Sequence, residues 1–284
     1  MTMHSDDTPV LILGGTGKTG RRVVKGLVER GRPVRIGSRS AALPFDWNAP
    51  ESWAPAVAGA SAIYITYQPD LAVPGAVEAI RRLAATALEG GVKRMVLLSG
   101  RGEPEAEEAE QALISSGADW TIIRASWFLQ NFSETFLLDA LKAGEVVLPV
   151  GDTAEPFIDV EDIAEIAVTA LTEPGHSGAL YEVTGPELLS FREAVAAISE
   201  AAGRSITFRQ VSAGDYAAML RGYGVPAEEI SLLLYLFTTV LDGRNAQLAD
   251  GVQRGLGRPP ARLSEYLART APTGIWKAQE PAMV

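Results

Sequence analysis

The chain has 284 residues, long enough for one large α/β unit with an appendage and for a sizeable core. Its 35 acidic residues outnumber its 25 Lys and Arg residues, and the formal net charge is −10. Direct nucleic-acid binding, which depends on basic side chains that neutralise phosphates, is therefore not expected. The absence of cysteine excludes disulfides, and two histidines, His4 and His176, cannot build a zinc site between them.

Targeting signals are not recognisable in the sequence. No apolar run approaches the ~18 residues that a membrane-spanning helix needs. Residues 1–7 are polar and acidic, unlike a signal peptide. We therefore expect a cytoplasmic protein that does not bind membranes.

The first predicted elements surround a glycine-rich turn. Residues 10–13 form a short apolar run that predicts a buried strand, and glycines follow at positions 14, 17 and 20. Residues 21–30 then place apolar side chains on one face at helical spacing. A strand, a glycine turn and a helix N-terminus in this order predict a cradle for a pyrophosphate.

Each glycine has a role in such a cradle. Gly14 permits the tight turn, Gly17 lets the backbone approach the pyrophosphate, and Gly20 lets the helix pack against the strand. The sequence from Gly17 to Thr19 is similar to the end of a P-loop, but that motif needs a glycine where Ile12 stands. The alternative is a glycine-rich turn without a ligand. We predict that the cofactor is held here by Gly14, Thr16, Gly17, Lys18, Thr19 and Gly20.

Strands and helices alternate through about residue 185. The predicted strands are 9–13, 33–38, 45–47, 61–67, 94–99 and 120–124, and the later helices are 51–58, 75–89 and 103–116. Such alternation predicts right-handed βαβ units and a parallel sheet covered by helices on both faces. The expected fold class is therefore α/β, a Rossmann-type doubly wound parallel sheet.

The pattern loosens after the sixth strand. We expect an amphipathic helix over 126–143, a strand over 146–148, a helix from 159 and a strand over 180–184. The chain is then mostly helical, over 191–202, 214–222, 226–241 and 262–269. We interpret this region as a smaller cap over the carboxyl ends of the strands, and a helical dimerisation element is the alternative. The predicted organisation is a dinucleotide-binding domain over 8–186, with 126–150 contributing in part to the substrate cleft, a cap over 187–276, and flexible tails at 1–7 and 277–284.

The residues after the second strand indicate the cofactor. An acid at this point binds the 2′-OH of NAD, whereas an arginine accommodates the 2′-phosphate of NADP. Here Arg39 stands between Ser38 and Ser40 without an acid, which favours NADP(H) over NAD(H). Asp46 and Trp47 follow where such folds usually hold the adenine, although Trp47 could equally belong to the core.

Five segments together carry a family resemblance. They are 14–20, 91–99, 116–124, 127–132 and 181–186. On these segments the chain resembles the NmrA-like, atypical short-chain dehydrogenases/reductases over roughly residues 8 to 275. Residues 17–19, 38–40 and 45–47 are similar to a narrower group, the festuclavine and agroclavine dehydrogenases of ergot alkaloid biosynthesis and their bacterial relatives.

The chain departs from ordinary short-chain dehydrogenases at the proton donor. Those enzymes use a Tyr-x-x-x-Lys pair, but none of the seven tyrosines here has a lysine four residues later. Ser99 stands where the family places its hydroxyl, and it is a candidate catalytic residue together with Tyr67. Both are also expected near the cofactor. Ser126, Trp127 and Asn131 are candidates for the substrate pocket.

Two functions remain open at this stage. In the first, NADPH reduces a small organic acceptor that needs no enzyme acid, such as an iminium or a quinone-like conjugated system. In the second, the protein binds NADP(H) and reports redox state to a partner, as the resemblance to NmrA-like proteins implies. The first is favoured because the aromatic cap resembles a substrate pocket. We expect a monomer or a homodimer, and no metal.

Overall fold

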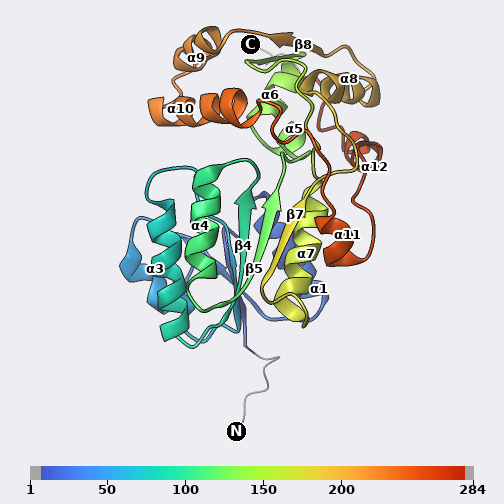
Figure 1. Cartoon of the computed structure of the whole chain (residues 1–284). Coiled ribbons are helices and arrows are strands. Elements are labelled where there is room, and N and C mark those ends of the chain that lie inside the picture. Colours follow the sequence, from blue (N-terminus) through green and yellow to red (C-terminus); the bar gives the residue numbers. More distant parts are fainter. Residues whose placement is uncertain (1–7, 279–284) are drawn as a thin grey trace. The chain divides into compact units, whose positions relative to one another are not determined.

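A computed structural model describes residues 8–278 of the chain (Figure 1). The tail predicted at 1–7 and residues 279–284 of the tail predicted at 277–284 lie outside the described residues. The chain divides into two compact units. The first comprises Met1–Ala125, Val160–Val183 and Ala249–Pro259, and the second comprises Ser126–Asp159, Thr184–Leu248 and Pro260–Val284. Residues 126–150, which we expected to contribute to a substrate cleft, belong to the second unit.

The first unit contains a six-stranded parallel sheet with the order β2-β1-β3-β4-β5-β7. The strands are β1 (Val10–Leu13), β2 (Val34–Gly37), β3 (Ala62–Ile65), β4 (Arg94–Gly100), β5 (Asp119–Ala125) and β7 (Ala179–Val183). The strand order reverses at β1, which has β2 on one side and β3 on the other. This topological switch point is where open parallel sheets bind ligands, beyond the carboxyl ends of the strands. The predicted doubly wound parallel sheet is confirmed.

Helices cover both faces of this sheet (Figure 1). They are α1 (Lys18–Glu29), α2 (Trp53–Val57), α3 (Ala76–Glu89), α4 (Pro104–Ile114), α7 (Val160–Thr172) and α11 (Gly251–Leu256), with a 3₁₀ turn at Pro50–Ser52. Helix α1 packs beside α7, and α3 packs beside α4. As expected for strands covered on both faces, β1 and β3 are apolar and buried along their whole length, and the middle of β4, 95–98, is apolar.

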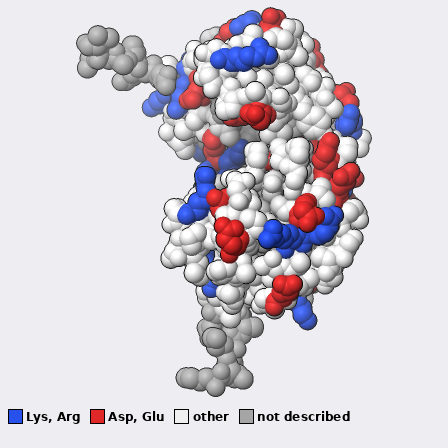
Figure 2. All heavy atoms as spheres, turned by 90° about the vertical axis from the view of Figure 1, so that its left-hand side faces the viewer, with Lys and Arg blue, Asp and Glu red and all other residues white. Residues whose placement is uncertain are grey.

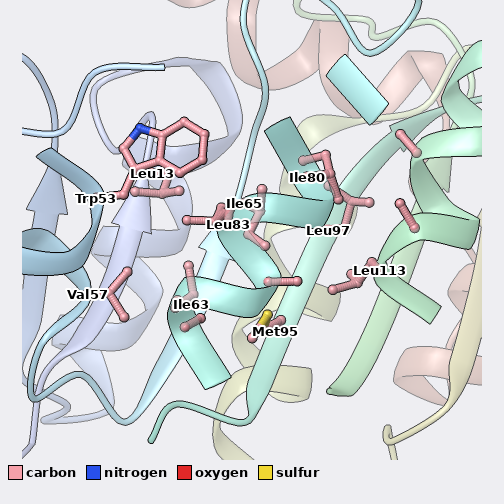
Figure 3. Close-up of a cluster of buried hydrophobic side chains, with 14 of the residues drawn as sticks. Leu13, Trp53, Val57, Ile63, Ile65, Ile80, Leu83, Met95, Leu97 and Leu113 are labelled. Carbon is pink, nitrogen blue, oxygen red and sulfur yellow. The ribbon is translucent and has the colours of Figure 1, made fainter. Parts of the chain in front are cut away.

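Alternate side chains of the strands build the core on the α3–α4 face (Figure 3). Side chains in a strand point to opposite faces in turn, so every second residue of β1, β3 and β4 faces the same helices. Their buried partners come from α2, α3 and α4 (Figure 3). The residues concerned include Leu13, Ile63, Ile65, Met95 and Leu97 from the strands, and Trp53, Val57, Ile80, Leu83 and Leu113 from the helices.

The strand predicted at 45–47 does not form. Phe45 is buried and its N–H donates a hydrogen bond to the carbonyl of Ser38, and Trp47 lies in a turn. The Phe45 and Trp47 rings pack against each other and against Trp53, with centroids 4.9–5.9 Å apart. The alternation of aromatic residues thus reflects packing in an aromatic cluster, which needs no strand partner.

The second unit is mostly helical and contains a two-stranded parallel sheet. The strands are β6 (Glu145–Leu148) and β8 (Thr207–Gln210), and the helices are α5 (Asn131–Glu134), α6 (Phe136–Ala143), α8 (Phe191–Ala201), α9 (Ala213–Gly222), α10 (Ala227–Tyr235) and α12 (Leu263–Thr270). A π-helical turn, Leu236–Val240, continues α10, and a 3₁₀ turn, Ala271–Thr273, follows α12.

The continuous helix predicted over 126–143 is wrong. Leu129 donates a backbone hydrogen bond to Ile158, and Ile158 donates one to Trp127, so this segment pairs as extended chain. Helix α5 then ends at Glu134, and Thr135, whose backbone is extended, separates it from α6. Backbone pairing with a segment almost thirty residues later overrides the helical spacing of the apolar residues.

Within residues 8–278, none of the helices has the length and apolar composition needed to cross a bilayer.

Candidate dinucleotide-binding site

The glycine turn between β1 and α1 requires glycine at position 14. Gly14 has a φ of +70°, in the left-handed region, and a β-carbon there would lie 2.2 Å from Oγ1 of Thr66. That hydroxyl in turn donates a hydrogen bond of 3.0 Å to the carbonyl of Leu13. The backbone of the turn is therefore held close to the end of β3, at the switch point of the sheet.

The N-terminus of α1 is available to an anion. Gly17 is the N-cap residue, and no side chain among the described residues caps this helix. The first turn of the helix itself contains no acidic side chain that could compete with a ligand for its N–H groups. These N–H groups and the helix dipole fit a pyrophosphate. Around them, Thr16 is exposed, Lys18 is half-buried and Thr19 is buried.

Arg39 lies two residues after the end of β2, and its side chain is exposed. Within residues 8–278, its guanidinium forms no ion pair and no hydrogen bond. The hydroxyls of Ser38 and Ser40 lie 3.4 Å apart on either side of it in the chain. A guanidinium without a protein partner suits a phosphate, which it can bind through two parallel hydrogen bonds.

We predicted that Asp46, Trp47 and Tyr67 lie near the cofactor. The structure makes Trp47 and Tyr67 neighbours and gives Asp46 hydrogen bonds within its own turn. The Trp47 and Tyr67 rings lie 4.8 Å apart between centroids, so these two residues are neighbours. Asp46 accepts a hydrogen bond from the N–H of Asn48, and its carbonyl accepts one from the indole of Trp53. Asp46 therefore has a clear structural role in this turn, and its predicted role in holding adenine stays a prediction.

Ser99 lies in the last part of β4 and is 5% exposed. Its hydroxyl oxygen is buried and has no hydrogen-bond partner among the described residues. A buried hydroxyl is normally hydrogen-bonded, so an unpartnered one is open to a bound water or a ligand. Tyr67 lies two residues after the end of β3, the strand next to β4. Partial burial raises the pKa of its phenol.

One acidic residue close to Ser99 in the chain, Glu103, was not predicted from the sequence. Glu103 is the N-cap residue of α4 and is 7% exposed. Burial and the neighbouring Asp70 carboxylate, together with a hydrogen bond between the two side chains, raise the pKa of Glu103 to about 9. The one signal in the sequence was the position of Glu103 just after the strand predicted at 94–99. This signal was easily overlooked, because the acidic helix that Glu103 begins resembles a solvated surface.

The three pocket candidates from the sequence lie in the second unit. Ser126 is buried and donates a hydrogen bond of 2.6 Å to the carbonyl of Pro156. Trp127 packs its ring against Phe191 and Phe237, with centroids 5.4 and 5.0 Å away. Asn131 begins α5 and is half-buried. These contacts give Ser126 and Trp127 packing roles, and their assignment to a substrate pocket stays a prediction.

Charged side chains of both signs are intermingled on the face drawn in Figure 2. Several of the arginines in the first unit pair with acids. Arg101 donates a hydrogen bond of 2.5 Å to Glu182, and Arg124 pairs with the buried Glu110. An anionic cofactor would thus be bound by local groups rather than by a broad basic field.

A parallel sheet with a glycine turn and an uncapped helix N-terminus at its switch point is the arrangement found in dinucleotide-binding proteins. Residues 14–174 match the NAD(P)H-binding family. The chain belongs to this NAD(P)H-binding family, and its relatives at 30% identity are named as oxidoreductases.

Two relatives and one solved structure show the range of the family. The chain is 30% identical to the NAD(P)H azoreductase of Xenophilus azovorans, with 90% of this chain and 96% of the relative covered. It is 29% identical to the agroclavine dehydrogenase of Claviceps fusiformis, with 91% and 96% covered. The structure of Citrobacter sp. triphenylmethane reductase complexed with NADP(H) is similar with a TM-score of 0.73 at 21% identity, over 92% of this chain and 99% of that one.

Proposed function

We propose that the protein is an NADPH-dependent reductase that transfers hydride to a small conjugated organic acceptor. The acceptor contains a C=N, C=C, C=O or N=N bond, as in an iminium, a quinone-like compound or an azo dye. The azo group is included because a relative with 30% identity is named as an azoreductase. The Tyr-x-x-x-Lys pair of ordinary short-chain dehydrogenases has no part in this reaction.

The observation that carries the proposal is the unpartnered hydroxyl of Ser99. Strand β4 is two places from β1 in the sheet, and neighbouring strands are about 4.8 Å apart. The hydroxyl therefore lies about 10 Å across the carboxyl edge of the sheet from the strand that ends in the cradle. A dinucleotide whose pyrophosphate occupies the cradle can extend along this edge.

The preference for NADPH over NADH rests on Arg39. Its exposed guanidinium follows β2 and has no competing partner within residues 8–278. It would bind the 2′-phosphate, while Gly14, Gly17 and the N–H groups of the first turn of α1 would bind the pyrophosphate. The adenosine and nicotinamide ends of the cofactor would be contacted by Asp46, Trp47 and Tyr67.

Bound NADPH supplies the hydride, and the residues of the chain position the two reactants. Ser99 would orient the nicotinamide or the acceptor with its free hydroxyl. Hydride transfer needs the reacting atoms about 3–3.5 Å apart, and holding them there provides much of the rate enhancement. Ser126, Trp127 and Asn131 would contribute to the acceptor site.

The test is oxidation of NADPH by the purified protein with a panel of cyclic N-alkyl iminium ions, quinones and azo dyes. We expect acceptor-dependent oxidation that is faster with NADPH than with NADH. Tight binding of NADPH without turnover of any acceptor would contradict the proposal. It would favour a redox sensor, which a change of oligomeric state or of partner binding on addition of cofactor would reveal.

A further inference from the structure

A buried carboxyl group lies at the end of β4, four residues after Ser99. Glu103 is 7% exposed and its Oε2 atom has no hydrogen-bond partner among the described residues. Ser99 Oγ is likewise buried without a partner. The Glu103 side chain hydrogen-bonds Asp70, but its Oε2 atom and Ser99 Oγ are two buried polar atoms in one strand-end turn that a bound water or ligand can satisfy.

The ordinary roles of an acidic residue at this position do not apply to Glu103. It is the N-cap residue of α4, yet its side chain makes no capping hydrogen bond. Within residues 8–278, no basic side chain forms an ion pair with it. The nearest arginine in the turn, Arg101, hydrogen-bonds Glu182 instead. The carboxyl is thus neither a helix cap nor half of a salt bridge.

The charged groups that act on Glu103 are both acidic. They are Asp70, in the loop after β3, and Glu105, in the first turn of α4. Burial without a cation and next to two carboxylates disfavours the ionised form of Glu103. Asp70 accepts a hydrogen bond from the N–H of Ala72. Because Asp70 is only half-buried and hydrogen-bonds Glu103, it lies between the buried carboxyl and solvent. Burial and these two acidic neighbours therefore favour the protonated form of Glu103.

Gly100 fixes the place of this carboxyl. A β-carbon on Gly100 would lie 2.4 Å from Oε1 and 2.5 Å from Oε2 of Glu103. Only glycine lets the carboxyl rest directly against the backbone at the end of β4. An alanine at this position would move the end of the Glu103 side chain while the acid itself remained.

We propose that Glu103 donates the proton that completes reduction of the acceptor, and that Asp70 returns a proton to it from solvent. This inference rests on the proposed function. Hydride from NADPH forms a new bond to one atom of the acceptor double bond, and the π pair moves to the other atom. The O–H bond of Glu103 breaks and its proton joins that atom, which leaves NADP⁺, the reduced acceptor and a Glu103 carboxylate.

The proposal narrows the class of substrate. A quinone or an azo compound becomes an anion when it accepts hydride, so a nearby acid lowers its barrier. A preformed N-alkyl iminium cation becomes neutral and needs no proton. An enzyme that retains a protonated carboxyl at its reacting edge is suited to acceptors of the first kind.

The first experiment uses no cofactor and no substrate. Infrared spectra at about pH 7 should show the C=O stretching band of a protonated carboxyl in the wild type. The band should be lost in Glu103→Gln and kept in Glu108→Gln, an equal charge change at an exposed position of the same helix. Absence of a band that depends on Glu103 would overturn the inference whatever the enzyme reduces.

The second experiment compares acceptors. Glu103→Gln should lower kcat for a quinone or azo dye by about 10²-fold or more, the usual contribution of a general acid, with a much smaller effect on an N-alkyl iminium. Gly100→Ala should show the same selectivity, because it displaces the acid without removing it. The dissociation constant of NADPH should change little in either variant.

Equal losses on both kinds of acceptor, or no loss on the quinone, would overturn the role of Glu103. Failure of the wild type to reduce any acceptor would instead contradict the proposed function. The infrared result would then still decide whether the Glu103 carboxyl is protonated.

Discussion

The carbonyl oxygen of Gly14 occupies the space that a β-carbon on Gly20 would need, 2.2 Å from its ideal position. The backbone of the turn and the first turn of α1 are therefore in direct contact. Gly17, between them, is different, because its φ is −75° and the nearest atom to a β-carbon there would be 3.2 Å away. The protein requires glycine at position 20 for its own packing, whereas a β-carbon at position 17 would make one tight contact, with the carbonyl oxygen of Gly14, that a small shift can relieve.

Gly17→Val should abolish NADPH binding and leave the apo fold intact. The branched side chain would occupy the place where the pyrophosphate approaches the backbone. Titration with NADPH and circular dichroism of the same sample would test this. Gly20→Ala is the contrasting variant, because its β-carbon meets backbone and should lower the stability of the protein itself. Wild-type affinity in Gly17→Val would show that the cofactor binds elsewhere.

Arg39→Ala should reduce the preference for NADPH over NADH by about 1.5–3 kcal/mol, the contribution of a hydrogen bond to a charged group. The loss should appear in the affinity for NADPH alone, because NADH lacks the 2′-phosphate. Arg81→Ala, an equal charge change at an exposed position of α3, is the control. Equal affinities of the wild-type protein for the two cofactors would remove the basis for this prediction.

The sequence predicted the sheet because its signals are local. The central strands carry apolar runs of three or four residues or more, and the helices beside them show one apolar face, as parallel sheets covered on both sides require. The glycine turn was also predictable, since turn geometry and close packing require Gly14 and Gly20 within a segment of ten residues, while its binding of a pyrophosphate stays a prediction.

Long-range pairing escaped the prediction. Strand β8, Thr207–Gln210, is short and mostly exposed, and it pairs with β6 some sixty residues earlier. The extended pairing of Leu129 with Ile158 was hidden for the same reason. In each case the partner that determines the conformation is distant in the sequence, so spacing alone gives no sign of it.

The missed acid has a similar explanation. Glu103 begins a helix in which Glu105, Glu107 and Glu108 are exposed, whereas Glu110 is buried and pairs with Arg124. Its burial depends on contacts with Gly100 and Asp70, the latter from the loop after a different strand. No property of the residue or of its immediate neighbours distinguishes it in the sequence.

Ser99→Ala and Tyr67→Phe should each slow turnover only modestly. Neither residue is the proton donor in the proposed reaction, so each would affect positioning rather than a proton-transfer step. The measurement is kcat and KM with NADPH and a quinone, and an iminium substrate should give a pH–rate profile without a tyrosine-like ionisation. A Tyr67→Phe variant that binds NADPH normally but is inactive would identify Tyr67 as the acid.

The pH dependence of stability should reveal the proton on Glu103. Its pKa is about 9 in the folded protein and ordinarily 4.5, so between these values the folded state binds a proton that the unfolded state has lost. The stability associated with this group is therefore fully present below about pH 4.5 and is lost as pH rises through about 9. One such group lowers the free energy of unfolding by at most about 1.4 kcal/mol per pH unit.

Glu103→Gln removes this titration and retains a hydrogen-bond donor for Asp70. The difference in unfolding free energy between Glu103→Gln and the wild type should therefore shift in favour of the variant as pH rises from about 6 to about 8. Denaturant unfolding at several pH values measures it, and Glu108→Gln should follow the wild type because its side chain is exposed. Parallel stability curves for wild type and Glu103→Gln would mean that Glu103 is ionised in the folded protein throughout this range, and the carboxyl at the end of β4 would then hold no proton to donate.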